Sequence, residues 1–435
     1  MNECAILVSY NTQLVSDVYR MPTLYHLEKF LSTARPRTNL FITAVMVFFF
    51  VAFDGTLMYL APIVMNRAGI AEGMMGLILG LSSVAGLLFD VVLSRLIENV
   101  TYRTMFFVML VAAATYPFFL FGATSITMYL IAMAVWGLYY NFYNMGTIDY
   151  VEQTTTTDEY PSYFGVLKVF DGLGNLVAPF FGSVLLVVAA SNLKMLPWAL
   201  AILVPAFVCY LVLFASEVRT KKSPIEMVKP RTSFLQTMRV WLKITWYLLP
   251  VLLLTLTINL VDSAVWTIGP IFSESLSAWG KSFGGAFMIA YTLPPIFVGW
   301  LVGRFVHALG KKQTAIGALF IGSCLLTLLG FVTAPLVLMS MICATSFCFA
   351  LAWPTINSAY ADDIALAPHE SKGIESVEDL FTNLGDTLGP IVGGFAAQYV
   401  GFAHAFTILG FFGATAALVL FWYTPSLLIT KLRYE

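Results

Sequence analysis

The sequence predicts an all-α integral membrane protein, in which twelve transmembrane helices form two pseudo-symmetric six-helix bundles. Its composition is one reason: 59% of the 435 residues are hydrophobic and only 11% are charged, whereas about a quarter of a soluble domain is charged. Another is the recurrence of continuous apolar runs of about 20 residues, the length that a helix needs to cross a bilayer. The third is an internal repeat. A transmembrane barrel would instead show short alternating strands.

The apolar runs predict six spans in each half of the chain. The first six fall at about 40–65, 73–95, 104–122, 126–150, 162–190 and 195–216. The second six fall at about 244–272, 282–303, 313–333, 335–361, 374–400 and 402–424. We therefore expect a tail (1–38), a first bundle (39–216), a polar basic linker (217–243) and a second bundle with a short tail (244–435).

Basic residues predict the orientation, because cytoplasmic loops of membrane proteins carry an excess of lysine and arginine. With the N-terminus inside, 19 of the 23 basic residues fall in the tails, the linker and the inner loops, and three fall in the outer loops. We expect both termini in the cytoplasm, with the protein in a cell or inner membrane.

The two halves repeat each other at a shift of about 208 to 211 residues. The stretch "DGTLMYLAPI" from Asp54 aligns with "DSAVWTIGPI" from Asp262, and "LGNLVAPFFG" (173–182) aligns with "LGDTLGPIVGG" (384–394). Parallel repeats joined by a linker are typical of proteins in which one half moves against the other around a site near the bilayer midplane.

Asp54 and Asp262 are carboxylates within apolar spans, where an aspartate costs about 2.5–3.5 kcal/mol near the helix centre. Asp54 lies about 21 Å along its span, inside a hydrocarbon core of about 30 Å. One interpretation is that either or both bind a coupling ion, first of all a proton, because burial favours the protonated acid. The alternative is that each accepts hydrogen bonds from neighbouring helices and fixes their packing.

Aromatic and polar side chains at helical spacing in two further spans, and beside Asp262, suit a small-molecule site. The candidate cavity residues are Trp136, Tyr140, Tyr143, Asn144, Asn259, Trp266, Trp353 and Asn357. The alternative is that these aromatic residues only pack or sit at the membrane interface, since 15% of the chain is aromatic.

The stretch "GWLVGRFVHALGKK" (299–312) resembles the signature of the major facilitator superfamily, although Gly303 stands where that signature has an aspartate. The first-half copy, "DVVLSRLIENVTYR", keeps Arg95 and Arg103, and "NLGDTLGPIVGGFAAQ" resembles the eleventh span of that family. The resemblance covers the whole chain through the span count, repeat, topology and linker. It implies a secondary transporter that works by alternating access.

The resemblance also implies a cytoplasmic gate, in which a loop arginine pairs with an acid at the end of span four or ten. Arg95 would pair with Asp149 or Glu152, and Arg304 with Asp362 or Asp363. Asp90 is a further candidate, and we expect Lys168 to pair with Asp379 or Glu378 of the other half; an anion-binding role for Lys168 is the alternative.

The expected function is secondary active transport of a small organic solute, coupled to protons or another ion. A facilitative uniporter, a lipid- or drug-like exporter and a non-transporting solute sensor are the alternatives. The two aspartates suit a cationic or polyhydroxy solute at least as well as an anion. We expect a monomer in the lipid bilayer without cofactor or metal, and the net charge of −1 gives no attraction to nucleic acid. An enzyme is not expected, because His307, His369 and His404 lack a catalytic arrangement with acids.

Overall fold

The computed structural model describes residues 22–96, 100–156, 159–189, 191–215, 234–276, 285–299 and 301–424. All of its long elements are helices. The first half contains α2 (Pro22–Arg67), α3 (Glu72–Leu96), α4 (Tyr102–Phe121), α5 (Ile126–Thr154), α6 (Tyr160–Val188) and α7 (Asn192–Ala215). The second half contains α8 (Phe234–Ser275), α9 (Ala286–Thr292), α10 (Pro294–Val298), α11 (Val302–Leu309), α12 (Lys311–Leu329), α13 (Pro335–Leu366), α14 (Ser371–Val400) and α15 (Phe402–Tyr423).

Two helices begin earlier than the apolar runs indicate. Helix α2 starts at Pro22 and α8 at Phe234, so residues 22–38 and 234–243, expected in the tail and the linker, are helical. Hydropathy detects only the part of a helix that lies in lipid, and a polar extension of the same helix gives no such signal.

The eighth predicted span is broken into three short helices. Pro294 and Pro295 open α10, where the missing backbone N–H groups and the proline rings interrupt the helical hydrogen bonds. A second break before α11 bends the segment by 68°.

In the part of the chain that is described, nine helices are long and apolar enough to cross a membrane, or ten if the broken segment counts as one span. Helices α5 and α14, with 29 and 30 residues, have the length but carry more polar residues. With these two, the helices match the twelve predicted segments, and the all-α multi-pass membrane fold is confirmed.

The packing within the halves follows the sequence repeat. In the first half α2 packs against α6 and α7, and in the second half the corresponding α8 packs against α14 and α15. A Cβ atom on Gly174 would lie 2.8 Å from the carbonyl oxygen of Phe48, and one on Gly385 would lie 2.9 Å from that of Leu256. The two glycines, like the two carbonyls, correspond in the repeat, so both bundles use the same close helix contact.

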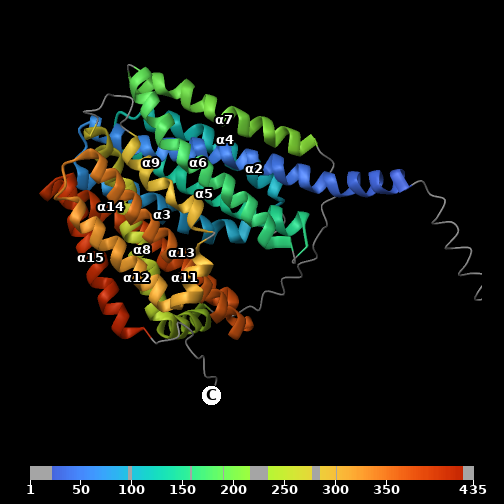
Figure 1. Ribbon diagram of the computed structural model, residues 1–435. Coiled ribbons are helices and arrows are strands. Elements are labelled where there is room, and N and C mark those ends of the chain that lie inside the picture. The colour runs from blue at the N-terminus through green and yellow to red at the C-terminus, as the bar shows by residue number, and fades with distance from the viewer. Residues whose placement is uncertain are drawn as a thin grey trace, which may run out of the picture.

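The halves meet mainly at one end of the bundle. We call this end the hairpin side, because α2 turns into α3 there, and the opposite end, where α7 ends and α8 begins, the linker side. Helix α3 contacts α14, α6 contacts α9 and α10, and α2 contacts α8. The closest approach is between α3 and α14, where a side chain on Gly76 would collide with the carbonyl of Pro390. In Figure 1 the two sets of helices lie together at the left and diverge toward the right and below.

Replacing Gly174 with alanine tests the shared helix contact. The new methyl group would meet backbone atoms of α2 within 3.0 Å, so we expect a loss of about 1–3 kcal/mol in the free energy of unfolding. Gly317→Ala is the matched control, because a Cβ atom there meets nothing within 4 Å. Thermal unfolding of the purified variants measures both, and a Gly174→Ala protein as stable as Gly317→Ala would contradict this packing.

Candidate functional site

Asp54 is enclosed within the first half and its charge is satisfied there. Its carboxylate Oδ1 accepts hydrogen bonds from Trp136 Nε1 at 2.8 Å and from the Tyr139 hydroxyl at 2.6 Å. Only 6% of the residue is exposed. On the other flank, a side chain on Gly55 would collide with Ala178 of α6, so α6 closes tightly over this position. Asp54 therefore joins α2 to α5 beneath α6.

Asp262 has a different environment. Its carboxylate Oδ1 accepts a hydrogen bond from the hydroxyl of Tyr291 on α9, and the residue is only partly buried. The Tyr291 backbone is itself held by Ser346 of α13, whose hydroxyl donates to the Tyr291 carbonyl. Asp262 is thus oriented by one aromatic hydroxyl, whereas Asp54 has two hydrogen-bond donors.

A second carboxylate lies beside Asp262. Asp386 of α14 interacts electrostatically with Asp262, and Gly385, the residue before it, packs tightly against Asn259 and Leu260 of α8. Sequence reasoning missed Asp386, because its span was interpreted through its glycines and prolines. The repeat carried the signal: Asp386 aligns with Asn175, so the second half has an acid where the first half has a neutral amide.

Three aromatic rings form a row on α5, near acids of both halves of the protein. The ring of Tyr140 lies 5.7 Å from that of Trp136 and 5.8 Å from that of Tyr143, measured between centroids. Tyr140 interacts electrostatically with Asp54, Asp171 and Asp386, yet 39% of it is exposed. Tyr140 is thus an exposed aromatic side chain within electrostatic range of carboxyl groups on α2, α6 and α14, which belong to both halves.

The remaining candidate cavity residues divide into two groups. Asn144 and Asn357 are exposed, and Trp353 is partly buried. Asn259 is buried and its amide donates to the Thr255 carbonyl one turn earlier, so it serves packing in α8. The Trp266 ring packs edge-on against Tyr291, 6.3 Å between centroids, and helps to hold the partner of Asp262.

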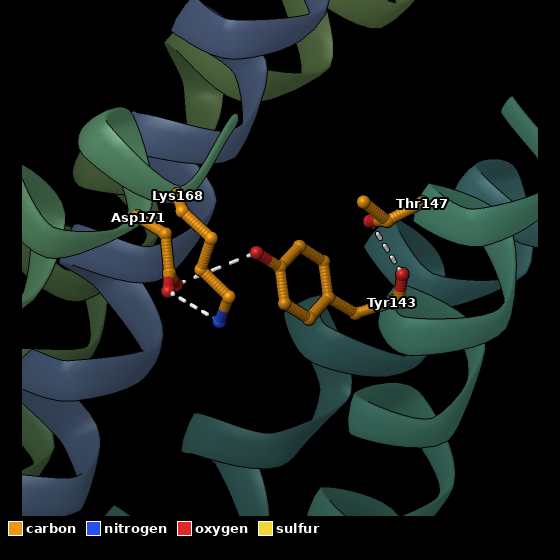
Figure 2. A network of polar contacts seen from close by, with 4 residues as sticks. All are labelled: Tyr143, Thr147, Lys168 and Asp171. Carbon is orange, nitrogen blue, oxygen red and sulfur yellow. Dashed lines mark hydrogen bonds and ion pairs between the residues drawn. The ribbon is translucent and has the colours of Figure 1, made fainter. Parts of the chain in front are cut away.

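Lys168 does not reach the other half, contrary to the expectation. Figure 2 shows its ammonium group at the carboxylate of Asp171 in the same helix, with the Tyr143 hydroxyl on the other oxygen. The distances are 3.1 Å for Lys168 Nζ to Asp171 Oδ2 and 3.4 Å for the tyrosine oxygen to Asp171 Oδ1. Asp171 lies three residues beyond Lys168, a spacing that brings side chains together on a helix. The Lys168 side chain is 80% exposed.

The expected pairing of Arg304 is also wrong in this conformation. Asp362 forms an ion pair with Lys311, from the same basic stretch, while Arg304 is exposed on α11 and, among the described residues, forms no ion pair with either aspartate. Asp363 is fully buried. Lys311 opens α12, which packs along α13, whereas Arg304 lies before that helix begins.

The first-half gate can be described only in part. The Asp149 carboxylate accepts two hydrogen bonds from the Gln153 amide, both of 2.7 Å. Glu152 interacts electrostatically with Asp149, and Asp379 is exposed beside Glu375 on α14. The side chains of Asp90 and Arg95 lie outside the described residues, so the pairing of Arg95 with Asp149 or Glu152 and the place of Asp90 in the gate stay predictions.

The comparisons with known proteins agree with this architecture. The profile of the Major Facilitator Superfamily matches residues 42–374. None of the curated proteins compared with the chain matches it. Similar solved structures include a bacterial homologue of the human lysosomal transporter Spinster in an inward-facing and unoccupied conformation, with a TM-score of 0.69 and 12% identity, over 89% of this chain and 96% of that one.

Two further structures have the same fold. The nucleoside transporter NupG has a TM-score of 0.69 and 14% identity, over 91% of this chain and 100% of that one. The human organic anion transporter MFSD10 has a TM-score of 0.62 and 16% identity, over 88% and 99%. The family match spans most of both bundles, and the chain is therefore a solute transporter of the major facilitator superfamily.

Proposed function

We propose that the protein is a proton-driven secondary transporter of a small organic solute, and that Asp262 and Asp386 together form its coupling site. The observation that carries this proposal is the electrostatic contact of two carboxyl groups, on α8 and α14, at the level of the aromatic row of α5. The second half thus differs from the first, whose single buried acid is already paired.

Two neighbouring carboxyl groups in a medium of low dielectric constant cannot both ionise without a large electrostatic cost. The hydroxyl of Tyr291 donates to Asp262 and carries no compensating charge, and the Ser263 hydroxyl donates to the Asn259 carbonyl of its own helix. We infer that the pair holds one proton when it is closed off from water. Access to water, or the arrival of a cationic group, would release that proton.

Asp54 is better explained by packing. Its two aromatic donors hold the carboxyl group in a fixed position in the buried interior of the first half, and a buried acceptor with its hydrogen bonds made is costly to disturb. We assign it a structural role, the alternative that the sequence left open for both acids.

We infer that the linker side faces the cytoplasm, because the tails, the linker and the loops on that side carry most of the basic residues. The hairpin side, where the halves touch, is then the outer side. The conformation described here would be closed to the outside and would face inward.

The cargo that fits the centre is a small cationic or polyhydroxy solute. Aromatic faces attract cations, and the acids around Tyr140 disfavour an anion. Lys168, the basic residue of this region, is neutralised by Asp171.

A thermal-shift screen of the purified protein against a solute library at two pH values would identify the cargo. We expect a cationic or polyhydroxy ligand to raise the unfolding temperature of the wild type, since a ligand that binds only the folded state stabilises it. That stabilisation should vanish in Asp262→Ala and persist in Asp149→Asn, which changes an acid at the far linker-side end of α5. Stabilisation only by anions would contradict the assignment.

Transport in proteoliposomes separates coupled from facilitated movement. With the solute found by the screen, a proton gradient should drive accumulation by the wild type, directed inward for symport or outward for exchange, and Asp262→Asn or Asp386→Asn should reduce uptake to equilibration. Asp54→Asn should retain proton-driven accumulation by the molecules that fold. A wild type that only equilibrates the solute would favour a facilitative uniporter, and accumulation by both Asp262→Asn and Asp386→Asn would refute the coupling pair.

Removing one donor to Asp54 tests its structural role. Tyr139→Phe should lower the free energy of unfolding by about 1.5–3 kcal/mol, because it leaves a charged acceptor with one bond fewer. In an Asp54→Asn background the same change should cost clearly less. Tyr129→Phe, a buried tyrosine of the same helix, is the control, and equal losses in both backgrounds would contradict a bond to Asp54.

A further inference from the structure

A polar contact between the halves lies on the hairpin side, away from the coupling pair. Tyr59 of α2 donates its hydroxyl proton to Glu274 Oε1 of α8 at 2.7 Å. The Ser183 hydroxyl of α6 lies 3.4 Å from the same tyrosine oxygen and donates to the Pro179 carbonyl at 2.9 Å. Three helices from both halves therefore converge on one tyrosine hydroxyl.

The first half is shaped to hold Tyr59 in this position. The tyrosine is completely buried, and its ring occupies the space that a side chain on Gly182 would need. The ring belongs to the packing between α2 and α6, which stay together within their bundle, whereas the hydroxyl reaches Glu274 of the other half.

Glu274 is placed to exchange partners. It lies one residue before the end of α8 and is only partly buried. The exposed Arg67, at the end of α2, interacts with it electrostatically. When the two halves separate on this side, water and Arg67 can replace Tyr59 as partners of the Glu274 carboxylate. An apolar contact broken in the same way would gain no new partner.

Backbone groups take part in several other contacts between the halves on this side. The Gly73 N–H of α3 donates to Gln398 Oε1 of α14 at 3.0 Å. Side chains on Gly76 or Gly394 would collide with the carbonyls of Pro390 and Glu72. These contacts set the distance between α3 and α14. The bond from Tyr59 is charge-assisted, and removal of the single hydroxyl oxygen of Tyr59 abolishes it.

We propose that the Tyr59–Glu274 hydrogen bond is the gate that holds the hairpin side closed and is broken in each transport cycle when that side opens. This inference rests on the alternating movement of the halves in the proposed function, but on neither the identity of the solute nor the coupling to protons. A bond present in one of two conformations biases their populations by its own free energy.

Distances between spin labels on the hairpin side test the gate directly. Thr124, in the turn between α4 and α5, and Thr333, in the turn between α12 and α13, are exposed and belong to different halves. In a full-length protein whose native cysteines are replaced, cysteines at these two positions carry the labels. Pulsed electron–electron double resonance in lipid nanodiscs, without solute or proton gradient, then gives the fraction of molecules with the longer label-to-label distance of the open hairpin side.

We expect the wild type to show mainly the short distance. Tyr59→Phe should raise the ratio of open to closed molecules about tenfold, because a hydrogen bond to a charged group is lost while the ring keeps its packing. Glu274→Gln should shift the ratio in the same direction but less, since an amide oxygen still accepts the bond. The double variant should open no further than Tyr59→Phe alone, because both changes remove one interaction.

Tyr210→Phe is the matched control, a buried tyrosine of α7 within the first half, and it should leave the distances unchanged. The gate is refuted if Tyr59→Phe and Tyr210→Phe give the same distribution, if the two gate changes add independently, or if the wild type already shows mainly the long distance. The measurement needs no transport. The gate proposal can therefore be refuted while the proposed coupling pair stands, and the coupling pair can be refuted while the gate stands.

Discussion

Lipid offers no hydrogen-bond partners, so every polar group within a span must be satisfied by the protein or by water between the helices. The two aspartates singled out by the repeat show these two solutions. Asp54 is satisfied by an indole and a phenol inside its own bundle. Asp262 is only partly buried and meets a second carboxylate. The first arrangement fixes a bundle, and we propose that the second responds to protons.

The difference between the halves depends largely on one pair of equivalent residues. The close contact between α2 and α6 recurs between α8 and α14, with Gly174 and Gly385 against equivalent carbonyls. The residue that follows the glycine is Asn175 in one half and Asp386 in the other. The repeat thus supplies a common framework, and a single amide-to-acid difference creates a pair of carboxylates in one half only.

Much of the fold could be predicted, because lipid imposes a length and an apolar composition on each span. The predicted spans agree with the helices within a few residues except where α2 and α8 extend beyond the apolar run and where prolines divide the eighth span. The family was correctly identified from weak motifs that agreed with one another, and its profile match confirms it.

The polar contacts were predicted less well, because spacing along one helix does not determine which helix lies opposite. Lys168 found a partner three residues away, and Lys311 took the place expected for Arg304. Tyr139 and Tyr59 are single aromatic residues in aromatic-rich spans, and nothing in their local sequence distinguishes them from packing residues. Asp386 could have been found from the repeat, as a mid-span acid that aligns with the neutral amide of Asn175.

The central claim is that the carboxylates and the aromatic row of α5 face a water-accessible space between the halves, open from the linker side. Reaction of a cysteine at Tyr140 with a membrane-impermeant thiol reagent tests it most directly, in a variant without native cysteines and in vesicles that expose the linker side. A cysteine at the exposed Leu211 of α7, a surface we assign to lipid, is the reference. The account predicts rapid modification at position 140 and little at 211. Equal protection of both positions would contradict it.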